Sequence, residues 1–202
     1  MTDVLVVCTV NMARSPLLER MLQSQADTRL GEGAVRIASA GTEGSVGYPA
    51  ADAAQKLAAD RGLSLDDHVS RPLYYLPIDQ IPLIITMARE HQQQLLDTGG
   101  QDRAGRTFLL RELLALVTRL RDDGALPALP SASDDPQARL HAVAAAAHAA
   151  RPAKLKRRHA DVPDPMGGKA SAFKAIGEEF DQAAPVLAEA LFGPAASGSR
   201  ER

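Results

Sequence analysis

The chain has 202 residues, enough for one domain with a substantial hydrophobic core. Its net charge of −2 argues against nucleic acid as the main partner, and its single cysteine excludes an internal disulfide framework. The short apolar run after Met1–Asp3 does not resemble a signal peptide, and no run is long enough to span a bilayer. The sequence therefore predicts no membrane partner and favours a cytoplasmic location, where Cys8 would stay reduced.

The first predicted elements are a strand, a tight loop and a helix. The run Val4–Val7 is apolar and rich in β-branched residues, which is typical of a buried strand. A helical pattern begins at Ser15, with Pro16 tolerated in the first turn. Residues 9–14 are therefore expected to form a loop at the start of a helix.

Further strands alternate with helices along the chain. Strands are predicted at 35–40, 82–86 and 106–110, and helices at 49–61 and from the third strand to about Gly99. This alternation implies parallel pairing, with helices that cover both faces of the sheet. We expect one α/β domain over residues 1–192, with a four-stranded parallel sheet of the flavodoxin-like, doubly wound type.

Residues 115–158 differ in composition from the rest of the chain. They predict a proline-rich loop, a helix at 137–150 and a basic segment, 151–158, with five positive side chains. We favour a solvated surface insertion, with docking of a partner or of a phosphorylated substrate as the alternative. A long helix over 169–192 follows, which Pro185 should kink or split, and residues 193–202 are expected to be a disordered tail.

The loop after the first strand is the main candidate site. Cys8 is followed by five residues and then by Arg14 and Ser15. Successive backbone N–H groups of such a loop can surround a tetrahedral oxyanion, and the helix N-terminus adds positive charge. Arg14 can hold two phosphoryl oxygens, and the positive surroundings favour the thiolate of Cys8 as a nucleophile, with Ser15 as a donor to the sulfur. The predicted phosphate-binding residues are Thr9, Val10, Asn11, Met12, Ala13, Arg14 and Ser15. A buried structural cysteine is the alternative.

The segment Cys8–Pro16 resembles the signature loop of the low-molecular-weight protein tyrosine phosphatases, a family that includes thioredoxin-coupled arsenate reductases. Further matching segments are 39–42, 46–50, His68 with 70–71, and Asp164–Pro165. The resemblance covers residues 1 to about 114 and 159 to 192. The chain looks like a longer variant of the actinobacterial type, with the insertion at 115–158.

The resemblance implies roles for residues outside the loop. Asp164 would be the general acid that protonates the leaving oxygen, with Asp161 as the fallback. Read alone, Asp164–Pro165 indicates only a turn. The resemblance also implies a supporting hydrogen-bond network that holds the loop open, with a left-handed conformation at its asparagine. The members of this network would be Asn11, Ser15, Ser39 and His68. This chemistry needs no metal or cofactor.

Several positions depart from the family pattern. Val10 stands where many members have glycine, and its branched side chain restricts the backbone. Ala13 replaces a second cysteine, and Ala88 lacks the acidic side chain that is frequent there and contacts the arginine. Met166 replaces the tyrosine after Asp-Pro, and the aromatic residue expected near Gly44 is missing. The residues that could instead wall the cleft for a phenyl ring are Tyr48, Tyr74 and Tyr75.

The predicted function is hydrolysis of a phosphomonoester through a cysteinyl-phosphate intermediate, by a protein tyrosine phosphatase. The expected partner is a phosphorylated protein or a small aryl phosphate. One alternative is an arsenate reductase, which would need an external thiol because the chain has no further cysteine. The other is a non-catalytic phosphate-binding module that uses the basic segment as its contact surface.

Overall fold

The computed structural model describes residues 1–99, 101–152 and 161–194. Most of the predicted basic segment and of the predicted disordered tail therefore lies outside the described residues, and both stay predictions.

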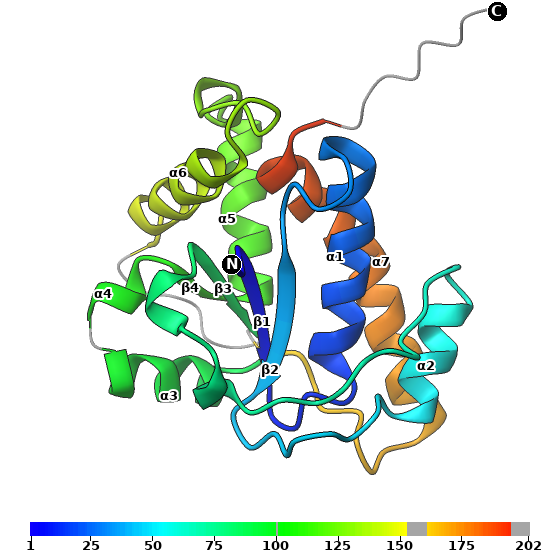
Figure 1. Ribbon diagram of the computed structural model, residues 1–202. Helices are drawn as coiled ribbons and strands as arrows, with labels where there is room; N and C mark the ends of the chain where they lie inside the picture. Colours follow the sequence, from blue (N-terminus) through cyan, green and yellow to red (C-terminus); the bar gives the residue numbers. More distant parts are fainter. Residues whose placement is uncertain (100, 153–160, 195–202) are drawn as a thin grey trace, which may run out of the picture.

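A four-stranded parallel sheet forms the centre of the molecule (Figure 1). Its strands lie in the order β2-β1-β3-β4. Their bounds are β1 (Val4–Cys8), β2 (Ile37–Gly41), β3 (Leu83–Thr86) and β4 (Thr107–Leu109). Every strand residue is buried, as the continuous apolar runs predicted. The predicted fold class is confirmed.

Helices cover both faces of the sheet. Their bounds are α1 (Arg14–Leu30), α2 (Asp52–Ala59), α3 (Arg89–Gly99), α4 (Gln101–Ala104), α5 (Leu110–Asp122), α6 (Pro136–Ala149) and α7 (Ala170–Phe192). Short 3₁₀ turns lie at η1 (Leu73–Tyr75), η2 (Ile78–Gln80) and η3 (Leu126–Ala128). The larger core cluster joins one face of the sheet to α1, α5, α6 and α7. The smaller cluster joins the other face to α3 and to η1 and η2.

The start of the predicted insertion is helical, so the expected loop from residue 115 is wrong. α5 runs to Asp122, and its buried residues Leu110, Leu113, Val117 and Leu120 recur at helical spacing. This spacing is visible in the sequence and would have identified the helix. Burial against β4 and α7 then fixes the element in place.

The predicted helix in the second half of the insertion is confirmed as α6, but this helix is more than a solvated surface element. Its Leu140 and Val143 are fully buried and belong to the larger core cluster. Arg139 donates from Nε to the Ala190 carbonyl of α7 at 2.8 Å and from Nη1 to the Leu126 carbonyl at 2.9 Å. The helix is thus an integral layer of the domain.

The last helix, α7, is a single 23-residue element that contains Pro185. The expected split at this proline does not occur, because its neighbours Ala183, Ala184 and Leu187 are buried in the core shared with α1. Tertiary packing here outweighs the loss of one backbone hydrogen bond. Within the described residues, none of the helices has both the length and the apolar character that crossing a bilayer requires.

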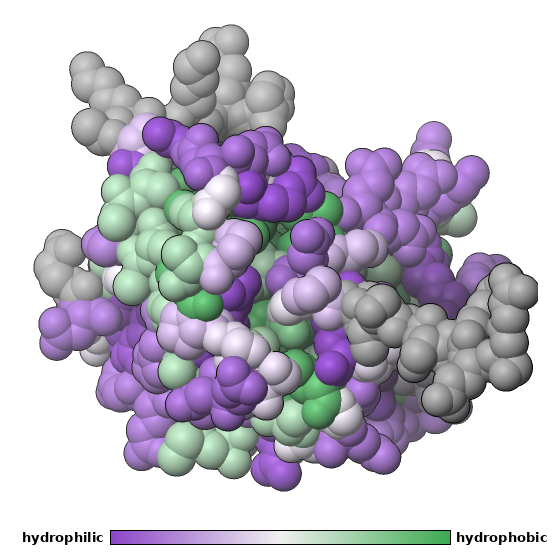
Figure 2. All heavy atoms as spheres, turned by 90° about the horizontal axis from the view of Figure 1, so that it is seen from above, coloured by the Kyte–Doolittle hydropathy of each residue, from purple (hydrophilic) through white to green (hydrophobic). Residues whose placement is uncertain are grey.

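Figure 2 views the end of the molecule that carries the segment between α5 and α6. Most side chains in this view are hydrophilic or weakly hydrophobic, with only scattered strongly hydrophobic ones. The opposite end, at the bottom of Figure 1, carries the carboxyl ends of the strands.

Candidate active site

Three loops converge at the carboxyl edge of the sheet (bottom of Figure 1). They are residues 9–13 after β1, 42–51 after β2 and 161–169 before α7. Ligands of open parallel sheets bind at this edge, next to the point where the strand order reverses. Here that point lies between β1 and β3. The fold thus brings the predicted nucleophile and the predicted acid to one place.

Cys8 lies at the end of β1, and Ser15 is its hydrogen-bond partner. The Sγ of Cys8 is 2.9 Å from the Oγ of Ser15, and Cys8 is 2% exposed. Asn11 donates from Nδ2 to Ser15 Oγ at 3.0 Å and to Ser39 Oγ at 2.8 Å. Because Ser15 accepts from Asn11, its own proton is available for the sulfur.

The backbone of Asn11 is held in the expected left-handed conformation, with φ of 58°. The Nε2 of His68 donates to the Asn11 carbonyl at 2.8 Å, and the Arg71 N–H donates to Asn11 Oδ1 at 2.9 Å. Burial lowers the pKa of His68, which keeps the ring neutral. Among the described residues, Asn11 is the one non-glycine with a positive φ, so Val10 has a backbone conformation that its branched side chain tolerates.

Glu19 joins this network, although no pattern in the sequence predicts it. The hydroxyl of Ser39 donates to its Oε2, and burial raises the pKa of its carboxyl. Glu19 lies on α1, whereas Ser39 lies on β2, so no local spacing links the two positions. The contact exists only because the first turns of α1 cross β2.

The loop of residues 9–13, called the phosphate loop from here on, offers free hydrogen-bond donors at its centre. Within the described part of the chain, the backbone N–H groups of Val10, Asn11, Met12 and Ala13 donate no hydrogen bond. Ala13, the N-cap of α1, gives no side-chain cap to the helix. These groups and the helix N-terminus together form a site for an anion.

Arg14 reaches the same site from the first turn of α1. Its Nη1 donates to the Val162 carbonyl at 3.1 Å, and its Nη2 donates to Thr9 Oγ1 at 3.0 Å. Nη2 also pairs with Asp164 Oδ2. Its Nε is buried and has no partner among the described residues. The guanidinium is therefore oriented without a carboxylate at Ala88, and one of its N–H groups is free for a ligand.

The two candidate acids differ in their surroundings. Asp164 is 40% exposed and accepts from Arg14 and, at 3.0 Å, from the Met166 N–H. Asp161 instead forms an ion pair with Arg89, at 2.9 Å from Nη2 to Oδ2, and this pairing lowers its pKa. Both carboxyls are paired with an arginine, but the partner of Asp164 is Arg14 at the phosphate loop, whereas the partner of Asp161 lies on α3, so the geometry favours Asp164.

The side chains considered as cleft walls are all exposed, and both of the segments that carry them touch the phosphate loop. Tyr48 is 55% exposed and lies three positions before Ala51, whose N–H donates to the Met12 carbonyl at 2.8 Å. Tyr74 and Tyr75 pack against each other on η1, with ring centroids 4.6 Å apart. Arg71, three positions before Tyr74, likewise contacts the phosphate loop through Asn11, so this kind of contact does not separate Tyr48 from Tyr74 and Tyr75.

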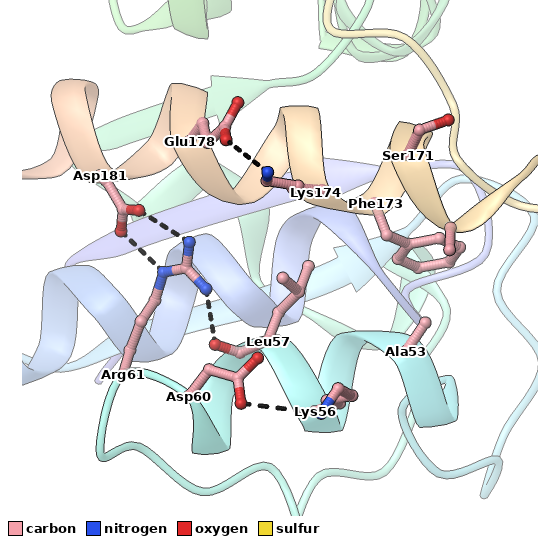
Figure 3. A pocket seen from close by; sticks show the side chains of 11 residues that line it. Ala53, Lys56, Leu57, Asp60, Arg61, Ser171, Phe173, Lys174, Glu178 and Asp181 are labelled. Atoms are coloured by element: carbon pink, nitrogen blue, oxygen red, sulfur yellow. Dashed lines mark hydrogen bonds and ion pairs between the residues drawn. The ribbon is translucent and has the colours of Figure 1, made fainter.

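A separate pocket of about 610 Å³ lies between α2 and α7 (Figure 3). Its apolar floor includes Leu57 and Phe173. All of its charged side chains are paired with one another: Lys56 with Asp60, Lys174 with Glu178, and Arg61 with Asp181. The pocket therefore presents no unpartnered charge to a ligand.

Comparison with known proteins agrees with this geometry. Residues 3–123 match the family model described as low molecular weight phosphotyrosine protein phosphatase. The chain is 36% identical over 112 residues to the low molecular weight protein-tyrosine-phosphatase Etp of Escherichia coli K12, a match that covers 55% of this chain and 71% of Etp.

Solved structures give the same result for the whole domain. The Erwinia amylovora tyrosine phosphatase AmsI superposes with a TM-score of 0.62 at 25% identity, over 94% of this chain and 93% of AmsI. A mutant of YwlE from Bacillus subtilis superposes with a TM-score of 0.64 at 24% identity, over 94% of this chain and 97% of YwlE, and shows the fold alone. The matches to the family model, to Etp and to AmsI favour a phosphatase over the arsenate reductase and the non-catalytic module. The chain belongs to the low-molecular-weight phosphotyrosine protein phosphatase family.

Proposed function

We propose that this phosphatase uses Cys8 as its nucleophile, Arg14 as its phosphoryl-binding side chain and Asp164 as its general acid and base. The observation that carries the proposal is the meeting of these three groups around the free N–H groups of residues 10–13. The role of Asp164 rests on this geometry, because the residue lies outside the matched range 3–123.

In the first step, the Cys8 thiolate attacks phosphorus, and the bond from phosphorus to the leaving oxygen breaks. The free N–H groups of the loop and the unpartnered Nε of Arg14 bind the phosphoryl oxygens. Phosphate displaces Asp164 from Arg14, and the freed carboxylate takes up a proton from solvent. Asp164 then protonates the leaving oxygen.

In the second step, water attacks the cysteinyl-phosphate. Asp164, now a carboxylate, accepts a proton from this water, and the sulfur leaves as a thiolate. The Ser15 hydroxyl, 2.9 Å from Sγ, stabilises the departing sulfur. The bonds of Asn11, Ser39 and His68 hold the loop in the shape that both steps require.

The proposed physiological substrate is a protein phosphorylated on tyrosine, which is what the name of Etp specifies for that enzyme. Tyr48, whose loop contacts the phosphate loop through Ala51, is the proposed wall for the phenyl ring, and Tyr74 and Tyr75, on the segment that follows Arg71, are the alternatives.

Hydrolysis of a series of aryl phosphates tests the proposal. Cys8→Ser and Arg14→Ala should abolish turnover. Asp164→Ala should slow turnover by about 10²–10⁴-fold, most for the poorest leaving groups, since these depend most on protonation. Wild-type protein that hydrolyses no aryl phosphate, or an Asp164→Ala loss that is the same for every leaving group, would contradict it.

A further inference from the structure

The proposed mechanism leaves one fully buried titratable side chain next to the phosphate loop without a role. His91 lies in the first turn of α3, and its side chain is 0% exposed. Its Nδ1 accepts from the Ala88 N–H at 3.1 Å, and its Nε2 lies 3.0 Å from Thr9 Oγ1. Thr9 directly follows Cys8, so the ring joins α3 to the phosphate loop.

These two contacts determine which ring nitrogen carries the proton. A backbone N–H can only donate, so Nδ1 must be an unprotonated acceptor. The proton of the neutral ring therefore lies on Nε2, which donates to Thr9. Burial and the charge of Arg14 lower the pKa of His91 to about 4, so the ring stays neutral at pH 7. The other charged groups that face it are Asp164, Asp161 and Glu90, the last at 3.4 Å from Nε2.

The Thr9 hydroxyl is then left with one free function. Its oxygen accepts from His91 Nε2 and from Arg14 Nη2, which uses both lone pairs. Its own proton has no acceptor among the hydrogen bonds of the described residues. Two donors on the oxygen turn this proton away from both of them, and an oxygen of a phosphoryl group in the loop is the acceptor that the site provides.

We propose that His91 is a positioning residue for phosphoryl binding: it fixes the Thr9 hydroxyl as a donor to the phosphoryl group and helps to hold Arg14 in its binding orientation. This inference rests on the proposed function of the loop. The competing explanation is that the ring only caps the first turn of α3 through Ala88.

Two substitutions of His91 separate these explanations. In His91→Asn, the side-chain oxygen can replace Nδ1 at the Ala88 N–H, but nothing reaches Thr9. In His91→Gln, the amide nitrogen can replace Nε2 at Thr9, but the acceptor for Ala88 is lost. The readouts are kcat/KM for p-nitrophenyl phosphate and the inhibition constant of inorganic phosphate.

We expect His91→Asn to lower kcat/KM and to weaken phosphate inhibition by about 10–100-fold, as for the loss of a hydrogen bond to a charged group. His91→Gln should restore most of the loss. His141→Asn, at an exposed position of α6, is the matched control and should behave as wild type. Wild-type kinetics in His91→Asn would overturn the inference and leave only the cap.

A double-mutant cycle with Thr9 tests whether His91 acts through this hydroxyl. Thr9→Val removes the hydroxyl at nearly constant volume, and Thr9→Ser keeps it. We expect Thr9→Val to lose phosphate affinity, Thr9→Ser to retain it, and His91→Asn to add little to Thr9→Val. Penalties that multiply fully would refute the positioning role. A Thr9→Val protein equal to wild type would refute it as well, and this result does not depend on whether His91→Asn folds. If wild type were inactive, the proposed function itself would fail, so the two failures are distinguishable.

Discussion

Replacement of Asn11 by alanine should both destabilise the domain and impair catalysis. Asn11 is fully buried, and its side chain makes three hydrogen bonds, to Ser15, Ser39 and the Arg71 N–H. At about 1 kcal/mol each, these bonds contribute about 3 kcal/mol. Alanine at a φ of 58° costs a further ~1–2 kcal/mol. We therefore expect Asn11→Ala to lower the free energy of unfolding by about 4–5 kcal/mol.

Urea unfolding measures this loss, and p-nitrophenyl phosphate kinetics measure its effect on the site. Asn11→Gly separates the two contributions, because glycine adopts the left-handed conformation freely but forms none of the three bonds. It should lose about 3 kcal/mol. In both variants kcat should fall, since the proton of Ser15 is no longer directed to Cys8. An Asn11→Ala protein with wild-type unfolding energy and wild-type kcat would refute this reasoning.

Three further predictions concern the loop, the insertion and acid stability. Gly41→Ala should lower kcat/KM by about a hundredfold, because the added Cβ would lie 2.5 Å from the Thr9 carbonyl oxygen and displace the loop. The control Gly105→Ala, whose Cβ would have no atom within 4 Å, should leave kcat/KM unchanged. Leu140→Ala should lower the free energy of unfolding by about 2–5 kcal/mol without a change in kcat, because Leu140 is fully buried. Replacement of its exposed neighbour, His141→Ala, should change the free energy of unfolding by no more than about 0.5 kcal/mol. Equal effects of the two substitutions would contradict the burial of α6. The free energy of unfolding should fall as the pH drops from about 6.5 to 4, with a contribution of up to about 3 kcal/mol from His91. In this range the unfolded chain binds a proton on His91, whereas the folded ring, whose pKa is lowered to about 4, does not. His68 acts in the same direction, and a pH-independent unfolding energy over this range would contradict both assignments.

Local patterns in the sequence were sufficient for the sheet and for the position of the phosphate loop. The strand at Val4–Cys8 is a continuous apolar run, and the loop after it is marked by Cys8 and Arg14 at fixed spacing. The limits of these patterns appear where packing decides the outcome. Pro185 predicts a kink or split in α7, yet the helix is a single element in which the neighbours of the proline are buried.

Two supporting residues, Glu19 and His91, are not predictable from local patterns, because their contacts join separate elements. Glu19 and Ser39 are 20 positions apart, and Thr9 and His91 are 82 apart. A buried histidine and an exposed one look the same in a sequence without an aligned family. In contrast, the leucine and valine spacing of α5 does predict a helix, and the change of composition from residue 115 is a misleading signal there.

The most direct test of the mechanism is detection of the covalent intermediate. Asp164→Ala protein is mixed with p-nitrophenyl phosphate, whose leaving group needs little protonation, and is quenched in acid for mass spectrometry. The slowed second step should let the phosphoenzyme accumulate. We predict one phosphoryl group, on the peptide that contains Cys8, which is the single cysteine of the chain. Turnover with no phosphorylated Cys8, or with the phosphoryl group on another residue, would contradict the account.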